Sequence, residues 1–445
     1  MKLPTFWGGI HPPQSKDLTV NEEIIFYSPQ GDLVFPMAQN IGAPCSPVVS
    51  KGDLVLVGDR LGNNDAFVSA PILSSVSGIV KDITMHMTTL GILEPCVIVE
   101  SDGRYEMSPN WKPLPDYENA DPKEYIKRIR EAGIVGFGGA TFPTAVKLSP
   151  PPDKKIKWLI VNGVECEPYL NCDNRLMIEN PEQILKGLSL ALRIFPEAQG
   201  IIAIENNKPK AIETMNATLS SLGLKNISIM PLAVKYPQGA EKMLIEAATG
   251  QEFPVTQLPA DVGCIILNVR TVYQIFRCII DGVPATTRVI TVTGDAIAHP
   301  RNLKVPLGTS VREVIDFCGG YREQPVKILS GGPMMGYAIR TIDVPVVKST
   351  SGILALTAKS TMLKPISACL RCGRCVDACP MGLVPSALDR VVLTRQYDIF
   401  EQYGGMNCIE CGSCTYVCPA LRPLTQACRD GKAAVTALRR KAAVK

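Results

Sequence analysis

Cys369-Leu-Arg-Cys372-Gly-Arg-Cys375-Val-Asp-Ala-Cys379-Pro380 is followed in the chain by Cys408-Ile-Glu-Cys411-Gly-Ser-Cys414-Thr-Tyr-Val-Cys418-Pro419. Both stretches have the spacing C-x2-C-x2-C-x3-C-P, which binds [4Fe–4S] clusters in bacterial chains that carry two of them. The fourth cysteine of each run then ligates the cluster of the other run. We therefore assign Cys369, Cys372, Cys375 and Cys418 to cluster 1, and Cys408, Cys411, Cys414 and Cys379 to cluster 2.

Zinc and disulfide bonds are the alternatives for these eight cysteines. A zinc site takes four ligands, commonly as C-x2-C pairs, and has no use for a third cysteine at the same spacing. Disulfides need an oxidising compartment, and the N-terminus lacks the apolar segment of a signal peptide. The pattern therefore favours two [4Fe–4S] clusters in an intracellular protein.

Composition limits the remaining possibilities. The chain has 445 residues, of which 46% are hydrophobic and 20% charged, so we expect about three globular domains. The net charge is only +4, and no basic arm or zinc-finger histidine pair is present, which argues against nucleic-acid binding. No run approaches eighteen apolar residues, so any attachment to a membrane is expected to be peripheral.

Residues 1–115 are rich in short apolar runs separated by Gly, Pro and Asp, which predicts a β domain. Within it, Val49–Gly58 and Ala70–Val80 resemble the half-motifs of the biotinyl/lipoyl barrel-sandwich hybrid. Carrier domains of that kind present a modifiable lysine between hydrophobic neighbours, and none occurs here. We therefore expect a structural role, with a carrier role as the alternative. In Gly8-Gly-Ile-His-Pro-Pro13, a histidine beside two prolines is expected to anchor a loop rather than bind a ligand.

Residues 116–285 alternate apolar strands with amphipathic helices, which predicts an α/β domain with a largely parallel sheet. Before its first strand, Gly136–Lys147 is a glycine-rich loop followed by a predicted helix, a combination that can hold a phosphate. The loop fits neither the Rossmann nor the Walker A pattern, so spacing alone leaves this open. Glu165 and Glu167 follow one strand and Asn268 another. The carboxylates could act as a catalytic pair or belong to a solvated loop, which is the simpler interpretation.

The remaining residues predict two further units and a tail. Residues 286–345 have the order strand, turn, strand and short helix, which suggests a β-grasp module. Residues 360–430 form the cluster domain, with a helix expected over residues 385–400. The tail, residues 431–445, is rich in alanine and basic residues and is expected to be an exposed helix.

Taken together, these pieces resemble the C subunit of the Rnf complex, the membrane-bound ferredoxin:NAD oxidoreductase, over nearly the full length. The middle domain is also similar to the FMN- and NADH-binding subunit of respiratory NADH dehydrogenases. The resemblance implies a multidomain α/β protein: a barrel-sandwich-hybrid-like β domain, a Rossmann-like FMN/NADH domain, a β-grasp module of the SLBB type and a helical domain with two [4Fe–4S] clusters.

The resemblance also implies roles for residues of the middle domain. Gly136, Gly138, Gly139 and Lys147 would hold the phosphate region of a non-covalent FMN, with Asn162, Glu165 and Asn268 lining the flavin. Phe142 would stack on the adenine of NAD(H) and Glu167 would bond its ribose, while Gly239 and Glu241 match a flavin-proximal segment less closely. Four positions depart from the relatives' pattern, in which Arg, Gly, Asp and Ser stand where this chain has Phe137, Thr141, Val164 and Cys166.

The implied function is electron transfer between NAD(H), FMN and the two clusters, since a flavin accepts a hydride and releases single electrons. By resemblance, the protein lies peripherally on the cytoplasmic side of the cell membrane. Its partners would be an iron–sulfur B subunit and integral membrane subunits, which translocate Na+ or H+ as ferredoxin is oxidised indirectly. The alternatives are a soluble flavin/iron–sulfur reductase of the cobalamin-reductase type and a non-catalytic relay without flavin.

Overall fold

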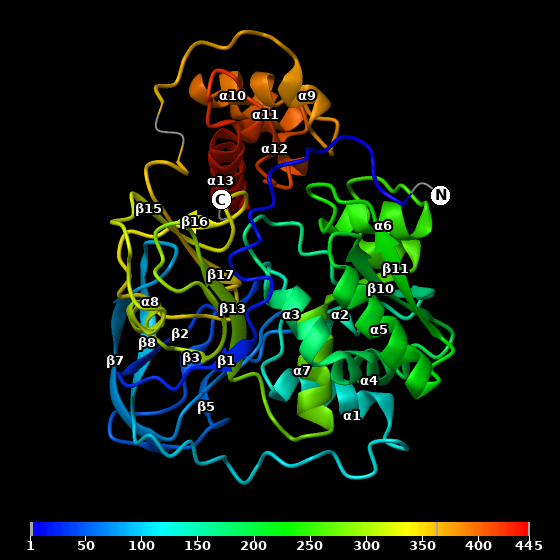
Figure 1. The fold of residues 1–445 in the computed structure, drawn as a ribbon, viewed down its shortest axis with the longest axis vertical. Coiled ribbons are helices and arrows are strands. Elements are labelled where there is room, and N and C mark those ends of the chain that lie inside the picture. The colour runs from blue at the N-terminus through cyan, green and yellow to red at the C-terminus, as the bar shows by residue number, and fades with distance from the viewer. Residues whose placement is uncertain (1–2, 362–363, 444–445) are drawn as a thin grey trace.

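The computed structural model describes residues 3–361 and 364–443. Four sheets, two of which share one core, make up the body, and a helical lobe formed by the C-terminal residues lies above them (Figure 1). Within the described residues, no helix combines the length and the apolarity needed to cross a bilayer.

A four-stranded parallel sheet in the order β11-β10-β9-β12 forms the centre of the α/β part. Its strands are almost continuously apolar and buried, as expected of a sheet that is covered on both faces. The strands are β9 (Trp158–Asn162), β10 (Gln199–Glu205), β11 (Ile227–Leu232) and β12 (Cys264–Asn268). The helices are α1 (Pro122–Glu131), α2 (Thr144–Lys147), α3 (Cys172–Glu179), α4 (Pro181–Leu192), α5 (Pro209–Leu222), α6 (Glu241–Thr249), η1 (Pro259–Val262) and α7 (Val269–Ile279).

The strands and the helices α4, α5, α6 and α7 follow the predicted alternation, whereas α3 is a helix that the sequence pattern did not predict. The larger core, formed by residues such as Leu185 and Val272, contains side chains of α4, α5 and α7, and a smaller core contains those of α6. Ligand-binding loops at the carboxyl ends of β9 and β12 therefore rest on a rigid support.

Two small antiparallel sheets form the β part of the N-terminal half. One has the order β2-β8-β7-β4 and the other β3-β5-β6, and one core joins them. The strands are β2 (Leu33–Pro36), β3 (Ser46–Pro47), β4 (Leu54–Val55), β5 (Arg60–Asn63), β6 (Ile72–Leu73), β7 (Gly78–Met87) and β8 (Leu93–Ser101).

A six-stranded mixed sheet, β1-β14-β13-β17-β15-β16, contains the β-grasp segment. β1 (Ile24–Phe26) lies within the predicted β domain of residues 1–115, but it pairs with β14 and not with the N-terminal sheets. Long-range pairing of this kind leaves no local signal. The elements are β1 (Ile24–Phe26), β13 (Thr287–Thr293), β14 (Arg301–Pro306), α8 (Val311–Phe317), β15 (Lys327–Ser330), β16 (Tyr337–Ala338) and β17 (Gly352–Leu356).

The helical lobe corrects two expectations. The single helix expected over residues 385–400 is two helices, because Arg395 adopts a left-handed conformation (φ 56°) between them. The last helix begins at Leu424 and packs against both, with Val435 buried, so only its final turns are exposed. The helices are α9 (Arg374–Asp377), α10 (Pro385–Leu393), α11 (Tyr397–Gln402), η2 (Gly405–Asn407), α12 (Ser413–Tyr416) and α13 (Leu424–Ala443). Residues 444–445 of the tail lie outside the described residues.

Candidate functional site

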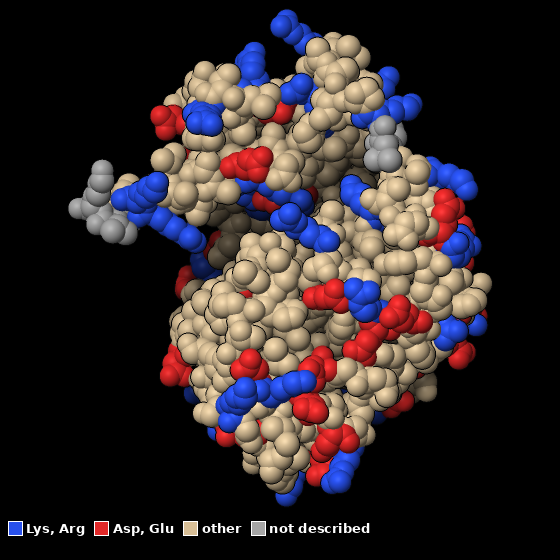
Figure 2. Space-filling model, turned by 90° about the vertical axis from the view of Figure 1, so that its left-hand side faces the viewer, with Lys and Arg blue, Asp and Glu red and all other residues tan. Residues whose placement is uncertain are grey.

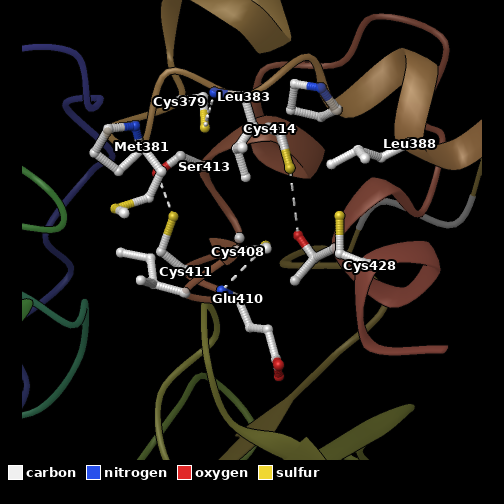
Figure 3. A pocket seen from close by; sticks show the side chains of 15 residues that line it. Cys379, Met381, Leu383, Leu388, Cys408, Glu410, Cys411, Ser413, Cys414 and Cys428 are labelled. Carbon is white, nitrogen blue, oxygen red and sulfur yellow. Dashed lines mark hydrogen bonds between the residues drawn. The ribbon is translucent and has the colours of Figure 1, made fainter. Parts of the chain in front are cut away.

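The first three cysteines of the second motif and Cys379 line one pocket in the lobe (Figure 3). Glu410 and Gly412 have left-handed φ values of 57° and 86°, which turn the chain sharply between the motif cysteines before α12 begins. Cys379 comes from the end of the other motif, after α9. The structure therefore brings together the four cysteines assigned to cluster 2: Cys379, Cys408, Cys411 and Cys414.

The chemistry of this pocket fits a group held by thiolates. The backbone N–H of Glu410 donates to Cys408 Sγ over 3.3 Å, and that of Leu383 donates to Cys379 Sγ over 3.4 Å. Burial raises the pKa of the Cys414 thiol to about 12, and binding of a metal would displace its proton. The donor set is that of a [4Fe–4S] cluster.

The first motif lies at the surface of the lobe. Cys369 and Cys372 are exposed, whereas Cys375 is buried. The crossing cysteine, Cys418, packs in one small cluster with Cys375, and Arg422 lies near both Cys418 and Cys369. Cys418 of the second motif therefore lies beside residues of the first, as the assignment of cluster 1 requires.

The glycine-rich loop Gly136–Lys147 is closed by its own backbone. Gly136 N–H donates to the carbonyl of Phe142 over 2.8 Å, and Thr141 N–H donates to the carbonyl of Gly136 over 3.2 Å. Gly139 has φ +128°, and a Cβ atom there would meet no atom within 4 Å. The loop therefore exposes bare backbone to open space, as an approaching cofactor requires. The following helix α2 has only four residues, less than the sequence pattern suggested.

Phe137, at the position where the relatives' pattern has Arg, turns into the core. Its side chain is 2% exposed and packs under the guanidinium of Arg288, 4.7 Å from the ring centre, and its N–H donates to Thr271 Oγ1. This departure therefore leaves the open side of the loop unchanged.

Several predicted flavin residues meet where β9 and β12 end. A Cβ atom on Gly138 would lie 3.3 Å from Asn268, and Asn268 Nδ2 donates to the carbonyl of Asn162 over 3.3 Å. Asn162 Nδ2 in turn donates to the carbonyl of Gly239 over 2.9 Å. The β9–β12 pairing places Asn162 and Asn268 side by side, so one edge of the sheet gathers residues from four distant segments.

Lys147 joins the same edge from the loop side. Its Nζ donates to Glu241 Oε1 over 2.8 Å and to the carbonyl of Ile266 over 3.0 Å. Phe142, which precedes Lys147 in the same segment, is half-buried at the point where the loop closes. The ammonium group is thus fixed at the carboxyl end of β12, within the region that the glycine-rich loop covers.

Glu165 and Glu167 point in different directions, so the structure does not bring them together as a catalytic pair. The Glu165 carboxylate accepts from the N–H groups of Asp173 (2.7 Å) and Asn174 (3.1 Å) at the start of α3. The Glu167 carboxylate accepts from the N–H groups of Met334 (3.2 Å) and Met335 (2.8 Å). The solvated-loop interpretation is also wrong, because neither side chain is exposed and both carboxylates accept backbone N–H groups. Burial also raises the pKa of Glu167 to about 7. Their roles at the flavin and the ribose stay predictions.

Lys16 is a structural residue that the sequence pattern did not single out. Its ammonium group is buried and donates to the carbonyls of Glu165 and Glu167 over 3.0 Å each, and to that of Leu170. Three carbonyls of one loop are thereby fixed by a side chain from the N-terminal segment. The signal available in the sequence was its closeness to the unusual Gly8–Pro13 segment.

The N-terminal segment also joins the lobe to the α/β part (Figure 1). Gly9 N–H donates to the carbonyl of Ala378, while Ile10 and Tyr236 exchange backbone hydrogen bonds. Tyr236 Oη donates to the carbonyl of Cys411 over 2.6 Å. A Cβ atom on Gly9 would lie 2.6 Å from the carbonyl oxygen of Tyr236, so only glycine fits there. Ile10, Tyr236, Ala378 and Cys411 form one apolar cluster, against which Cys166 packs.

His11 itself is exposed and lines a pocket beside this junction, together with Lys16 and Tyr236. The anchoring contacts of the segment come from Gly9 and Ile10 rather than from His11. The cysteine at position 166, where the relatives' pattern has serine, receives the N–H of Gly239 over 3.4 Å. Cys166 therefore connects the flavin edge to the junction.

Family models match four parts of the chain. Residues 4–104 match the RnfC barrel sandwich hybrid domain and residues 129–277 the Nuo51 FMN-binding domain. Residues 289–338 match the SLBB domain, and residues 362–419 match the 4Fe-4S dicluster domain. The predicted order of domain types is confirmed.

Similar curated proteins match over most of the chain. The C subunit of the proton-translocating ferredoxin:NAD(+) oxidoreductase complex of Clostridium ljungdahlii is 46% identical, and the match covers 90% of this chain and 86% of the relative. The C subunit of the Na(+)-translocating ferredoxin:NAD(+) oxidoreductase complex of Acetobacterium woodii is 43% identical, and the match covers 99% of both proteins. The C subunit of the ion-translocating oxidoreductase complex of Rhodobacter capsulatus is 42% identical, and the match covers 86% of this chain and 74% of the relative.

Proposed function

Because the chain belongs to the C-subunit family of the Rnf ion-translocating ferredoxin:NAD+ oxidoreductases, we propose that it carries electrons between NAD(H) and the rest of such a complex. It binds FMN and two [4Fe–4S] clusters and works with the other Rnf subunits. FMN exchanges two electrons with a nicotinamide and one with a cluster. The cobalamin-reductase alternative is disfavoured, since these relatives all bear the name of such a complex.

The junction at Tyr236 is the observation that supports this proposal best. Gly239, at the flavin edge, donates to Cys166, and Cys166 packs in the apolar cluster that contains Tyr236 and Cys411. The edge of the parallel sheet and the pocket of cluster 2 are therefore connected through one apolar cluster and the hydrogen bonds at its ends. We propose that cluster 2 exchanges electrons with the flavin directly.

In this scheme cluster 1 is the electron carrier at the surface of the lobe. Cys369 and Cys372 are exposed, and Arg371 and Arg374 beside them are exposed as well. Figure 2 shows Lys and Arg side chains over this lobe, with fewer Asp and Glu. A one-electron carrier with a negative surface would complement this face.

The test of the function is reduction by NADH. After anaerobic purification we expect about eight iron and eight sulfide per chain, together with one FMN that is released on denaturation. NADH should bleach the flavin and produce the EPR signal of reduced clusters. Near-stoichiometric zinc with little sulfide would exclude the clusters, and clusters without flavin would leave the non-catalytic relay as the function.

We further propose that the protein lies on the cytoplasmic face of the membrane and is held there by its partner subunits. The basic end of α13 is the competing anchor, because each Lys or Arg near an anionic surface contributes about 1 kcal/mol. Arg439, Arg440 and Lys441 are all exposed. Replacing all three by Gln should leave membrane association largely intact in cell fractionation, whereas deletion of the integral subunits should release the protein. The opposite pair of results would identify the tail as the anchor.

A further inference from the structure

Two side chains of α13 line the pocket of cluster 2 without belonging to either cysteine motif. Thr425 and Cys428, in the first two turns of the helix, are 8% and 1% exposed. Both lie in the wall of the pocket that contains Cys379, Cys408, Cys411 and Cys414 (Figure 3). Each carries a hydrogen that can be donated to sulfur.

The hydrogen bonds of Thr425 fix the direction of its hydroxyl. Its N–H donates to Thr415 Oγ1 over 2.9 Å, and the two hydroxyl oxygens lie 2.8 Å apart. Because Thr415 Oγ1 accepts that N–H, its own proton is free to go to Thr425 Oγ1. The Thr425 proton is then directed at Cys414 Sγ, 3.6 Å away. A cysteine that ligates iron has no proton to give, so the hydroxyl must be the donor.

The same argument applies to Cys428. Its thiol is within hydrogen-bonding reach of the Cys408 sulfur, and both residues lie in the core of the lobe. Cys408 is deprotonated when it ligates iron, whereas a buried thiol that binds no metal stays neutral. Cys428 Sγ–H is then the donor and Cys408 the acceptor.

The first motif lacks this arrangement. The residue after the third cysteine is Thr415 in the second motif and Val376 in the first. Across residues 3–361 and 364–443, no side-chain hydroxyl or thiol forms a hydrogen bond with the sulfurs of the cluster 1 ligands. The two donors on α13 are therefore specific to the cluster beside the flavin.

We propose that Thr425 and Cys428 are positioning residues that raise the reduction potential of the cluster held by Cys408, Cys411, Cys414 and Cys379. Reduction adds one electron, and part of the added negative charge resides on the sulfurs. Hydrogen bonds to these sulfurs strengthen with that charge and stabilise the reduced form. The inference rests on the proposed function, because it presupposes a cluster in this pocket.

The experiment is an EPR-monitored redox titration of the purified, cluster-loaded protein and of two variants, Thr425→Val and Cys428→Ala. Each variant removes one donor, which should lower the equilibrium constant for reduction of this cluster roughly two- to tenfold. For one electron, tenfold corresponds to about 59 mV. The potential of the other cluster should not move. Thr425→Ser, which restores the hydroxyl, should recover the original potential.

Thr436→Val is the matched control, because Thr436 lies on the same helix and its hydroxyl donates to the carbonyl of Lys432. It should leave both potentials unchanged. Potentials that are the same in all variants would overturn the proposal. Loss of iron and sulfide in both Thr425→Val and Cys428→Ala would also overturn it, since the two side chains would then hold the pocket together. A wild-type protein without clusters would instead refute the proposed function, so the two failures are distinguishable.

Discussion

Replacing Cys379 by Ala is expected to remove cluster 2 and to leave cluster 1 in place. Cys379 belongs by sequence to the first motif, yet its sulfur lies in the pocket of Cys408, Cys411 and Cys414. Cys428 is a further thiol in the wall of this pocket, so the replacement is made in a Cys428→Ala background, in which only three cysteines line it. Iron content should fall from about eight to about four per chain, with loss of one of two EPR signals.

The reciprocal variant is Cys418→Ala, which should remove the cluster of the first motif and keep the other. Cys318→Ala is the control, because Cys318 is equally buried but lies in the core of the six-stranded sheet. Its iron content should equal that of the unmodified protein. If Cys379→Ala instead lost the cluster of its own motif, the exchange of ligands between motifs would be refuted.

Gly138→Trp is expected to abolish flavin binding. Gly138 is exposed on the loop, and a Cβ atom there would lie 3.3 Å from Asn268, at the edge where the flavin residues meet. An indole at this position would fill the space left by the bare backbone. Unlike Gly139, this glycine does not have a positive φ, so loss of flavin would report filled space and not backbone strain. Flavin released by denaturation, per chain, is the measurement.

A graded comparison separates a flavin site from general damage. Lys147→Ala removes a charge-assisted contact worth about 1.5–3 kcal/mol, so flavin affinity should fall at least tenfold without being lost. Iron and sulfide should be unchanged in both variants, because the clusters are bound by a separate lobe. Full flavin content in both would place the cofactor elsewhere in the chain.

The cysteine motifs and the α/β strands could be predicted because their information is local. A C-x2-C-x2-C-x3-C-P run defines its own turn chemistry, and an apolar strand that is buried on both faces shows its burial in four or five residues. The same locality explains the errors. Whether a helix breaks at Arg395 depends on a left-handed residue that is neither glycine nor asparagine, which no propensity scale anticipates.

The long-range contacts could not be predicted from one sequence. β1 pairs with a strand from the other half of the chain, and Lys16 finds its carbonyl partners far along the sequence. The sequence left Glu165 and Glu167 open between a catalytic pair and a solvated loop. Only the fold shows that one carboxylate caps α3 and that the other holds the backbone after β15. Cys428 and Thr425 were missed because neither fits a motif.

The contacts of the N-terminal segment also show at which stage of synthesis the flavin domain and the cluster lobe become connected. Gly9 and Ile10 emerge early from the ribosome, but Ala378 and Cys411, which they and Tyr236 contact, are made near the end of translation. Contacts between such distant residues form late in folding. A nascent chain can therefore fold its flavin domain before the contacts with the cluster lobe have formed. A chain made only as far as α7 still lacks the cysteines of both clusters, so the flavin domain and the cluster lobe are joined only in the finished polypeptide.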